Sequence, residues 1–166
     1  MIRAVAFAVL LVAATSFPAF AGDDDHDHDD DHHVSELGGV RAVHAWTRAT
    51  SGETALVFVE IENGSDKPVA IEGGEADFAG SVDLVGFQLQ GGEPGYVVLP
   101  EVPIQPGKEL KLEPEGLALR LNGLTRPLHQ GNEVEIEIEF DSGHMDVHVE
   151  VGAENAKAHS HAGHQH

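Results

Sequence analysis

Hydrophobic and polar residues alternate with a period of two along most of the chain, and no stretch follows the helical period of 3.6 residues. In residues 134–140 every second residue is apolar and the residues between them are glutamates, which predicts a half-exposed strand. Residues 55–61 are apolar at most positions, which predicts a strand buried on much of both faces. Further strands are predicted at residues 40–46, 68–72, 82–90, 96–99, 109–112, 117–121 and 144–151.

Pairs of turn-forming residues separate the predicted strands at short intervals. Asn-Gly, Gly-Gly, Pro-Gly and Ser-Gly pairs stand at 63–64, 73–74, 91–92, 94–95, 106–107, 122–123 and 142–143. Short, regularly spaced strands with no helix between them predict an all-β sandwich.

Residues 1–21 have the pattern of a secretory signal peptide. Arg3 precedes an apolar run at 4–14, and Ala19-Phe20-Ala21 supplies the small residues that signal peptidase recognises. An uncleaved membrane anchor is the alternative, but the apolar run is short for a spanning helix and an acidic stretch follows it. We therefore predict a mature chain that begins at Gly22, is not inserted in a membrane, and is periplasmic or secreted.

The chain has a formal net charge of −20 at pH 7 and no cysteine. Nucleic-acid binding needs clustered lysine and arginine, so a nucleic-acid partner is excluded. Without cysteine the protein has neither disulfides nor thiolate metal ligands. The strong acidity favours cations as ligands, although solubility alone would also account for the scattered glutamates.

Most of the twelve histidines lie in two polar segments, DDDHDHDDDHH at 23–33 and HSHAGHQH at 159–166. Neutral imidazole is the commonest metal ligand in proteins, and mixed histidine tracts are typical of metal-collecting tails. A purification tag is the alternative, but a tag is normally an uninterrupted histidine run. We predict tails at 22–36 and 153–166 that are disordered without metal and flank a domain at 37–152. Their candidate metal ligands are His26, His28, His32, His33, His159, His161, His164 and His166.

The predicted last strand carries a second candidate metal site. Alternation puts His144, Asp146 and His148 on one face of it. If the strand at 134–140 pairs with it, Glu135 or Glu137 would lie on the same surface and could also bind the metal. The alternative is an ordinary solvated strand face with acidic residues.

Two histidines of the body fall outside that strand. His44 is two residues from Trp46 and is expected to share its strand face, where a packed or hydrogen-bonded histidine is more common than a metal ligand. His129 stands in the turn at 127–131 and is expected at the surface.

Two motifs resemble a known family. Residues 44–50, HAWTRAT, are similar to an AWxR signature, and residues 117–140, LALRLNGLTRPLHQGNEVEIEIEF, are similar to a segment in which an MLxGL-like run leads to PLxxGxxVxxxxxF. Over roughly residues 40–151 the chain resembles the PCu(A)C periplasmic copper chaperones. The resemblance implies a cupredoxin-like (Ig-like) β-sandwich. It also implies Cu(I) bound by two histidines and two methionines, and delivery toward copper enzymes such as cytochrome c oxidase.

The chain departs from this family at the positions that the resemblance assigns to the copper ligands. Ala118-Leu119-Arg120 stands in place of His-x-Met, Val85 or a neighbour in place of the first histidine, and residues 96–99 include no methionine. Cu(I) prefers sulfur ligands, and Met145 is the single methionine of the mature chain, so a Cu(I) site of the family's type is not expected. Arg120 is expected to form an ion pair with a carboxylate or to be exposed.

The sequence thus predicts a periplasmic metal-binding protein, a copper chaperone or metal buffer that handles Cu(II) or Zn(II) through histidine and aspartate. Imidazole and carboxylate ligands suit both ions, and the general order of affinities favours Cu(II). The alternative is a degenerate chaperone domain that docks to a copper-enzyme or cytochrome oxidase assembly protein. An enzyme is not expected, because the chain has no GxSxG elbow, phosphate-binding loop, HExxH motif or cysteine nucleophile.

Overall fold

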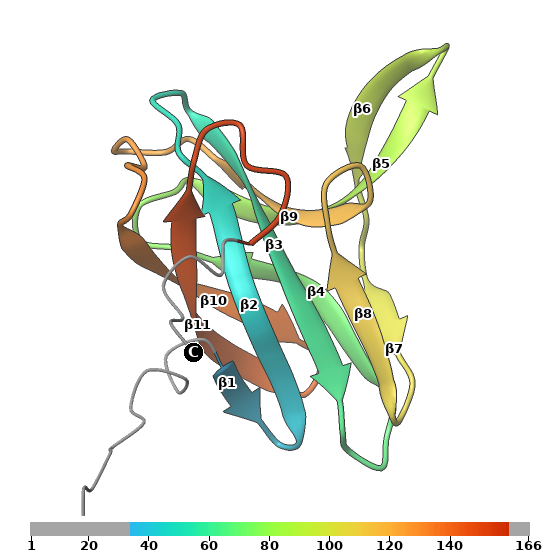
Figure 1. Ribbon diagram of the computed structural model, residues 1–166. Coiled ribbons are helices and arrows are strands. Elements are labelled where there is room, and N and C mark those ends of the chain that lie inside the picture. The colour runs from blue at the N-terminus through green and yellow to red at the C-terminus, as the bar shows by residue number, and fades with distance from the viewer. Residues whose placement is uncertain (1–33, 160–166) are drawn as a thin grey trace, which may run out of the picture.

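The computed structural model describes residues 34–159, which form strands, turns and loops with no α-helix among them (Figure 1). No helix of the described part has the length and apolar character that crossing a bilayer requires. The strands are β1 (Val34–Leu37), β2 (Val40–Arg48), β3 (Thr54–Asn63), β4 (Val69–Glu75), β5 (Ser81–Gln90), β6 (Glu93–Val98), β7 (Val102–Ile104), β8 (Lys108–Leu112), β9 (Leu117–Asn122), β10 (Glu133–Phe140) and β11 (Gly143–Gly152).

The strands form one continuous sheet, which folds back on itself into a β-sandwich. The strand order is β6-β5-β9-β8-β3-β2-β11-β10-β4-β7, and β1 pairs with β2. A further pairing joins β4 to β5, so the two ends of this order meet. Between the layers lies an apolar core in which Ile61, Leu119, Ile138 and Val149 are completely or almost completely buried. The prediction of an all-β sandwich is confirmed.

Every predicted strand overlaps an observed one, and the two strands that were not predicted are short. β7 has three residues, too few for a recognisable alternation. β1 lies largely inside the range 22–36 that we expected to be tail, but it pairs with β2 from Val34↔Val43 to Leu37↔Val40. Residues 153–159 also fall in a range expected to be tail, yet Ala156 packs against the apolar cluster around Trp46. The folded body therefore extends beyond 37–152 at both ends.

Two of the predicted turns lie inside strands. The Gly73-Gly74 pair belongs to β4, where the missing side chain of Gly74 lets the carbonyl oxygen of Glu137 come close. Pro94-Gly95 belongs to β6, at the end of the strand order, where a missing backbone donor is tolerated. The sequence alone could not show that these glycines and this proline lie in strands, because glycine and proline are also the residues that form turns.

A β-bulge interrupts β2 at His44. The register with β3 shifts between Val43 and Trp46, and His44 has a positive φ of 55°. Trp46 is buried while His44 is exposed, although both side chains line the same cavity. The extra residue of the bulge interrupts the two-residue alternation at this point.

Arg48, at the end of β2, fastens the C-terminal segment to the sandwich. Its Nε donates a 2.7 Å hydrogen bond to the carbonyl oxygen of Ala156, and its guanidinium lies 6.0 Å from the Trp46 ring centre and 5.7 Å from that of Phe58. The cation–π contacts with the two rings and the hydrogen bond from the charged guanidinium together hold the C-terminal segment against β2. The arginine of the AWxR-like motif thus has a structural role.

We expect Arg48→Ala to lower the free energy of unfolding by about 1–3 kcal/mol, because it removes the hydrogen bond to Ala156 and the contact with the two rings. Arg41→Ala is the matched control. Arg41 pairs with Glu62 at 2.9 Å on the surface, so its loss should cost at most about 1 kcal/mol. Urea unfolding measures both variants, and equal effects would contradict the role assigned to Arg48.

Candidate metal-binding surfaces

The β10–β11 hairpin presents the polar face that the alternation predicts. Across the antiparallel pair, Glu135 faces His148, Glu137 faces Asp146, and Glu139 faces His144. The residues between them, among them Met145 and Val147, are buried in the core. Histidine and carboxylate side chains are therefore gathered on one exposed surface.

On this surface the two histidines form separate ion pairs. His144 Nδ1 lies 3.4 Å from Glu137 Oε1, and His148 Nδ1 lies 3.0 Å from Glu133 Oε1, with Nε2 3.8 Å from Glu135 Oε2. Within residues 34–159 no group of three or more His, Cys, Asp or Glu side chains is arranged to hold a metal ion. A metal site at His144, Asp146 and His148, with Glu135 or Glu137, stays a prediction.

The hairpin site is tested by changing both of its histidines in a chain that retains everything else. If His144→Ala with His148→Ala lowers the number of Cu(II) or Zn(II) ions bound by one, the hairpin binds metal. The matched control is His129→Ala, since His129 is an exposed turn residue. An unchanged metal stoichiometry in the double variant would identify the face as solvated surface.

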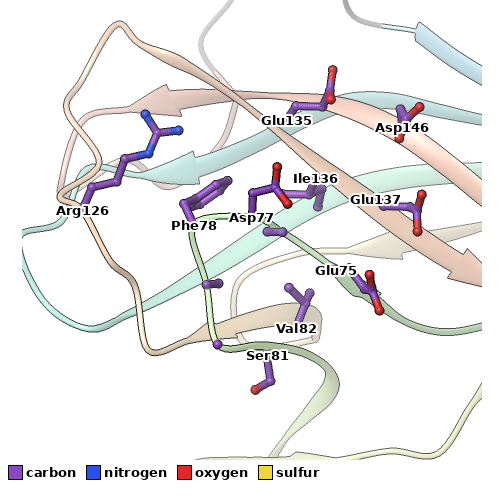
Figure 2. A pocket seen from close by; sticks show the side chains of 14 residues that line it. Glu75, Asp77, Phe78, Ser81, Val82, Arg126, Glu135, Ile136, Glu137 and Asp146 are labelled. Carbon is purple, nitrogen blue, oxygen red and sulfur yellow. The ribbon is translucent and has the colours of Figure 1, made fainter.

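Beside the hairpin lies an open cleft of about 720 Å³ between β4, the loop that follows it, β10 and β11 (Figure 2). Arg126 lines it as well, with its guanidinium 5.0 Å from the Phe78 ring centre. With several carboxylates and one guanidinium the cleft repels anions and attracts cations. The carboxylates that line it are Glu75, Asp77, Glu135, Glu137 and Asp146.

The positions that the resemblance assigns to copper ligands lie together in the fold, but they carry no metal-binding atoms. Val85 on β5 pairs with Val98 on β6 and with Ala118 on β9. Val85 and Ala118 are fully buried and belong to an apolar cluster with Trp46 and Phe58. Branched aliphatic and methyl groups cannot coordinate copper, so the residues present do not fit the family's Cu(I) site.

Arg120 replaces a ligand of that site and forms an ion pair, as expected. Its Nη2 lies 3.5 Å from Asp83 Oδ2 on the neighbouring strand β5. Asp83 also accepts a 2.8 Å hydrogen bond from the Asn122 side chain. A small polar network therefore occupies the place of the methionine.

Among the tail histidines, the described residues include only His159. Its side chain is 7% exposed, its Nε2 lies 3.0 Å from Glu150 Oε2, and its ring centre lies 5.4 Å from that of His44. Sequence reasoning did not anticipate this meeting of His44 and His159, because no local pattern relates residues at opposite ends of the folded body. The remaining candidates lie outside the described residues: His26, His28, His32, His33, His161, His164 and His166.

A family profile described as "Putative lipoprotein LpqE-like" matches residues 40–151, which is most of the chain. The chain belongs to the LpqE-like family. A search of curated proteins gave no match.

Solved structures with a similar fold are PCuAC domains. The apo PmoF2 PCuAC domain has 19% sequence identity and a TM-score of 0.64, with 77% of this chain and 100% of that domain covered. The copper-bound PCuAC domain from PmoF2 has 18% sequence identity and a TM-score of 0.62, with 73% of this chain and 98% of that domain covered. The solution structure of CuI-DR1885 from Deinococcus radiodurans has 28% sequence identity and a TM-score of 0.55, with 68% of this chain and 77% of that chain covered. The LpqE-like chain thus has the cupredoxin-like sandwich of the PCuAC domains, and the predicted resemblance is confirmed.

Proposed function

We propose that this LpqE-like protein binds copper outside the cytoplasm and acts as a copper chaperone or metal buffer. The observation that carries the proposal is its likeness to PCuAC domains, two of which are described as copper-bound or CuI forms. The match covers 98% of the copper-bound PmoF2 domain. Binding and delivery of a metal ion, rather than catalysis, is the activity that this likeness supports.

The chemistry of the available donors favours Cu(II) and Zn(II) over Cu(I). The site expected from the family's pattern is apolar here, at Val85 and Ala118, and the mature chain would hold a single methionine, Met145, which is 3% exposed in the core. The sulfur donors that Cu(I) prefers are therefore missing. Imidazole and carboxylate groups suit Cu(II) and Zn(II), so we propose that the histidines and aspartates of the tails bind these ions, Cu(II) more tightly.

The proposed location follows from the first residues of the chain and from the family. Residues 1–21 have the pattern of an export signal, and the family profile is described as one of lipoproteins. We propose that the protein is exported to the periplasm or beyond, with a sandwich domain between tails at both ends. At such a location it would meet metal ions before they reach extracytoplasmic copper enzymes.

A second candidate function is supported by the apolar cluster at the ligand positions. A chaperone domain that has lost its Cu(I) ligands could retain the surface by which it docks to a copper-enzyme assembly protein. The β5–β6 hairpin projects from the sandwich (Figure 1), and its Leu89 and Val98 are large apolar residues that are 67% and 58% exposed.

Analysis of protein isolated from its native compartment without added metal tests the principal proposal. We expect the N-terminal residue to be Gly22 and the protein to carry copper or zinc above the level of an acidic control protein that lacks histidine tracts. A protein that begins at Met1 would contradict the proposed export. Protein free of both metals that nevertheless copurifies with an assembly protein would favour the docking function.

A further inference from the structure

The C-terminal segment returns across the sandwich after β11 and brings a tail histidine against the body. In Figure 1 the chain leaves β11, loops over the end of the sandwich and approaches β2. Arg48 fixes this path through its 2.7 Å hydrogen bond to the Ala156 carbonyl oxygen. His159 then lies beside His44 of β2, with ring centres 5.4 Å apart and ring planes at 48°.

The ring separation fits a shared metal ion. When two imidazoles bind one ion through N–metal bonds of about 2.0 Å at a tetrahedral angle, their ring centres stand about 5 Å apart. The tilt excludes a parallel stack, while ordinary tilted or edge-to-face ring contacts share this range of separations. A separation of 5.4 Å with planes tilted by 48° is therefore compatible with two ligands that converge on one ion.

The backbone at His44 is held in an unfavourable conformation that places its ring there. His44 has a φ of 55°, in the left-handed region, which few residues other than glycine adopt, although asparagine, aspartate and histidine adopt it more often than the rest. The bulge leaves the His44 side chain exposed, beside the cavity that Trp46 also lines. Strained backbone of this kind is found most often at functional sites, where the surrounding structure maintains it.

Glu150 orients the second ring. His159 Nε2 lies 3.0 Å from Glu150 Oε2, and the His159 side chain is 7% exposed. A carboxylate bound to one nitrogen of an imidazole fixes the ring and increases the basicity of the other nitrogen, as in the carboxylate–histidine–metal arrangement of many metalloproteins. For His159 the nitrogen on the metal side would be Nδ1.

We propose that His44 and His159 together bind a divalent copper or zinc ion, with Glu150 as the positioning residue. The inference deepens the proposed function, on which it rests, by placing one metal ion at the junction of the C-terminal tail and the sandwich. Two protein ligands leave coordination positions for water.

A cavity of about 320 Å³ adjoins both rings and gives access to the site. Trp46 and Leu112 contribute apolar surface to it, and Glu60 and Glu113 contribute carboxylates. Lys111 also lines it, with Nζ held 3.2 Å from Glu60 and 3.3 Å from Glu109. Lys111 donates hydrogen bonds to Glu60 and Glu109, that to Glu60 having the larger effect, and these raise the pKa of Lys111, so its ammonium group stays protonated and does not act as a metal ligand.

The test is a Cu(II) titration of the full mature chain, followed by calorimetry and by electron paramagnetic resonance. We expect one ion bound at least about tenfold more tightly than the others, with nitrogen hyperfine structure in its spectrum. His44→Asn and His159→Asn should each abolish the tight binding of this one ion and leave the more weakly bound ions in place. His129→Asn is the control and should change nothing. Asparagine is chosen at position 44 because it tolerates positive φ.

A second pair of variants separates the positioning role of Glu150 from a general effect of charge. Glu150→Gln should weaken the tight site about 10–100-fold without reducing the number of ions bound, as loss of such outer partners typically does. Glu101→Gln removes the same charge from an exposed loop and should leave the affinity unchanged. Equal effects of the two substitutions would overturn the assignment of Glu150.

The outcomes also separate this inference from the proposed function. Wild-type protein that binds several ions with a single weak affinity, or His44→Asn and His159→Asn variants that retain the tight ion, would overturn the site and leave the proposed function standing. Wild-type protein that binds no metal would overturn both. If His44→Asn does not fold, His44→Gly replaces it, because glycine adopts positive φ without strain.

Discussion

Replacement of the seven tail histidines other than His159 by asparagine is expected to remove most of the divalent ions that the mature chain binds. Imidazole is the strongest Cu(II) and Zn(II) donor that the chain possesses, because it has no cysteine. The sequence predicts tails that are disordered without metal, and such ligands must become ordered when they bind, so each tail site should be weak and independent of the others. The same loss should appear in the wild type below about pH 6, where imidazoles become protonated and compete with the metal. Calorimetric titration counts the ions.

The acidic tail offers a matched control for this prediction. Seven aspartates accompany the histidines in residues 23–31, and their replacement by asparagine removes charge while retaining every imidazole. We expect this variant to keep most of its Cu(II) and to lose mainly affinity that depends on salt. A histidine-substituted protein that binds as many ions as the wild type would refute the tail hypothesis and shift attention to the sandwich.

The fold could be predicted from the sequence because alternation and turn chemistry are local signals. Along residues 134–140 the glutamates and apolar residues alternate without exception, and β10 follows this pattern to the last residue. The face of the hairpin, with His144, Asp146 and His148 together, follows from the same rule. Strands too short to alternate, such as β7, and strands adjoining a polar tail, such as β1, give no comparable signal.

The candidate sites were less predictable, because their geometry depends on side-chain partners and on long-range contacts. Alternation places His144 and His148 on one face, but it does not say that each would pair with a glutamate of β10. The bulge at His44 and the return of His159 are both needed to bring those two rings together. A bulge leaves no clear mark in the sequence, since the alternation simply fails for one residue.

The positions that the resemblance assigns to copper ligands have a structural role that the sequence only partly indicated. Small and branched side chains there could have left a pocket, but Val85 and Ala118 pack with Trp46 and Phe58 in an apolar cluster. Trp46 and Phe58 have ring centres 4.8 Å apart, a separation at which aromatic pairs attract each other. These positions therefore contribute to the stability of the sandwich.

The second large effect concerns stability at the closure of the sandwich. We expect Gly74→Ala to lower the free energy of unfolding by about 1–3 kcal/mol, the usual range for overpacking a tight site. A Cβ at Gly74 would overlap the carbonyl oxygen of Glu137 and press on Val82 at 3.3 Å. Because β4 pairs with β10 on one side and β5 on the other at this residue, neither neighbour can move without disturbing a ladder. Thermal unfolding should show a midpoint several degrees below that of the wild type.

A graded series of strand glycines makes this prediction specific. A Cβ at Gly73 would approach the Val82 carbonyl oxygen at 3.2 Å, a tight but adjustable contact, so Gly73→Ala should have an intermediate effect. A Cβ at Gly95, in β6, would meet nothing within 4 Å, so Gly95→Ala should leave stability unchanged or raise it by up to about 1 kcal/mol as the unfolded chain loses freedom. The order Gly74, Gly73, Gly95 follows from backbone proximity alone. Were Gly74→Ala as stable as Gly95→Ala, the close approach of β4 and β10, beside the β4–β5 pairing that closes the sandwich, would not exist in solution.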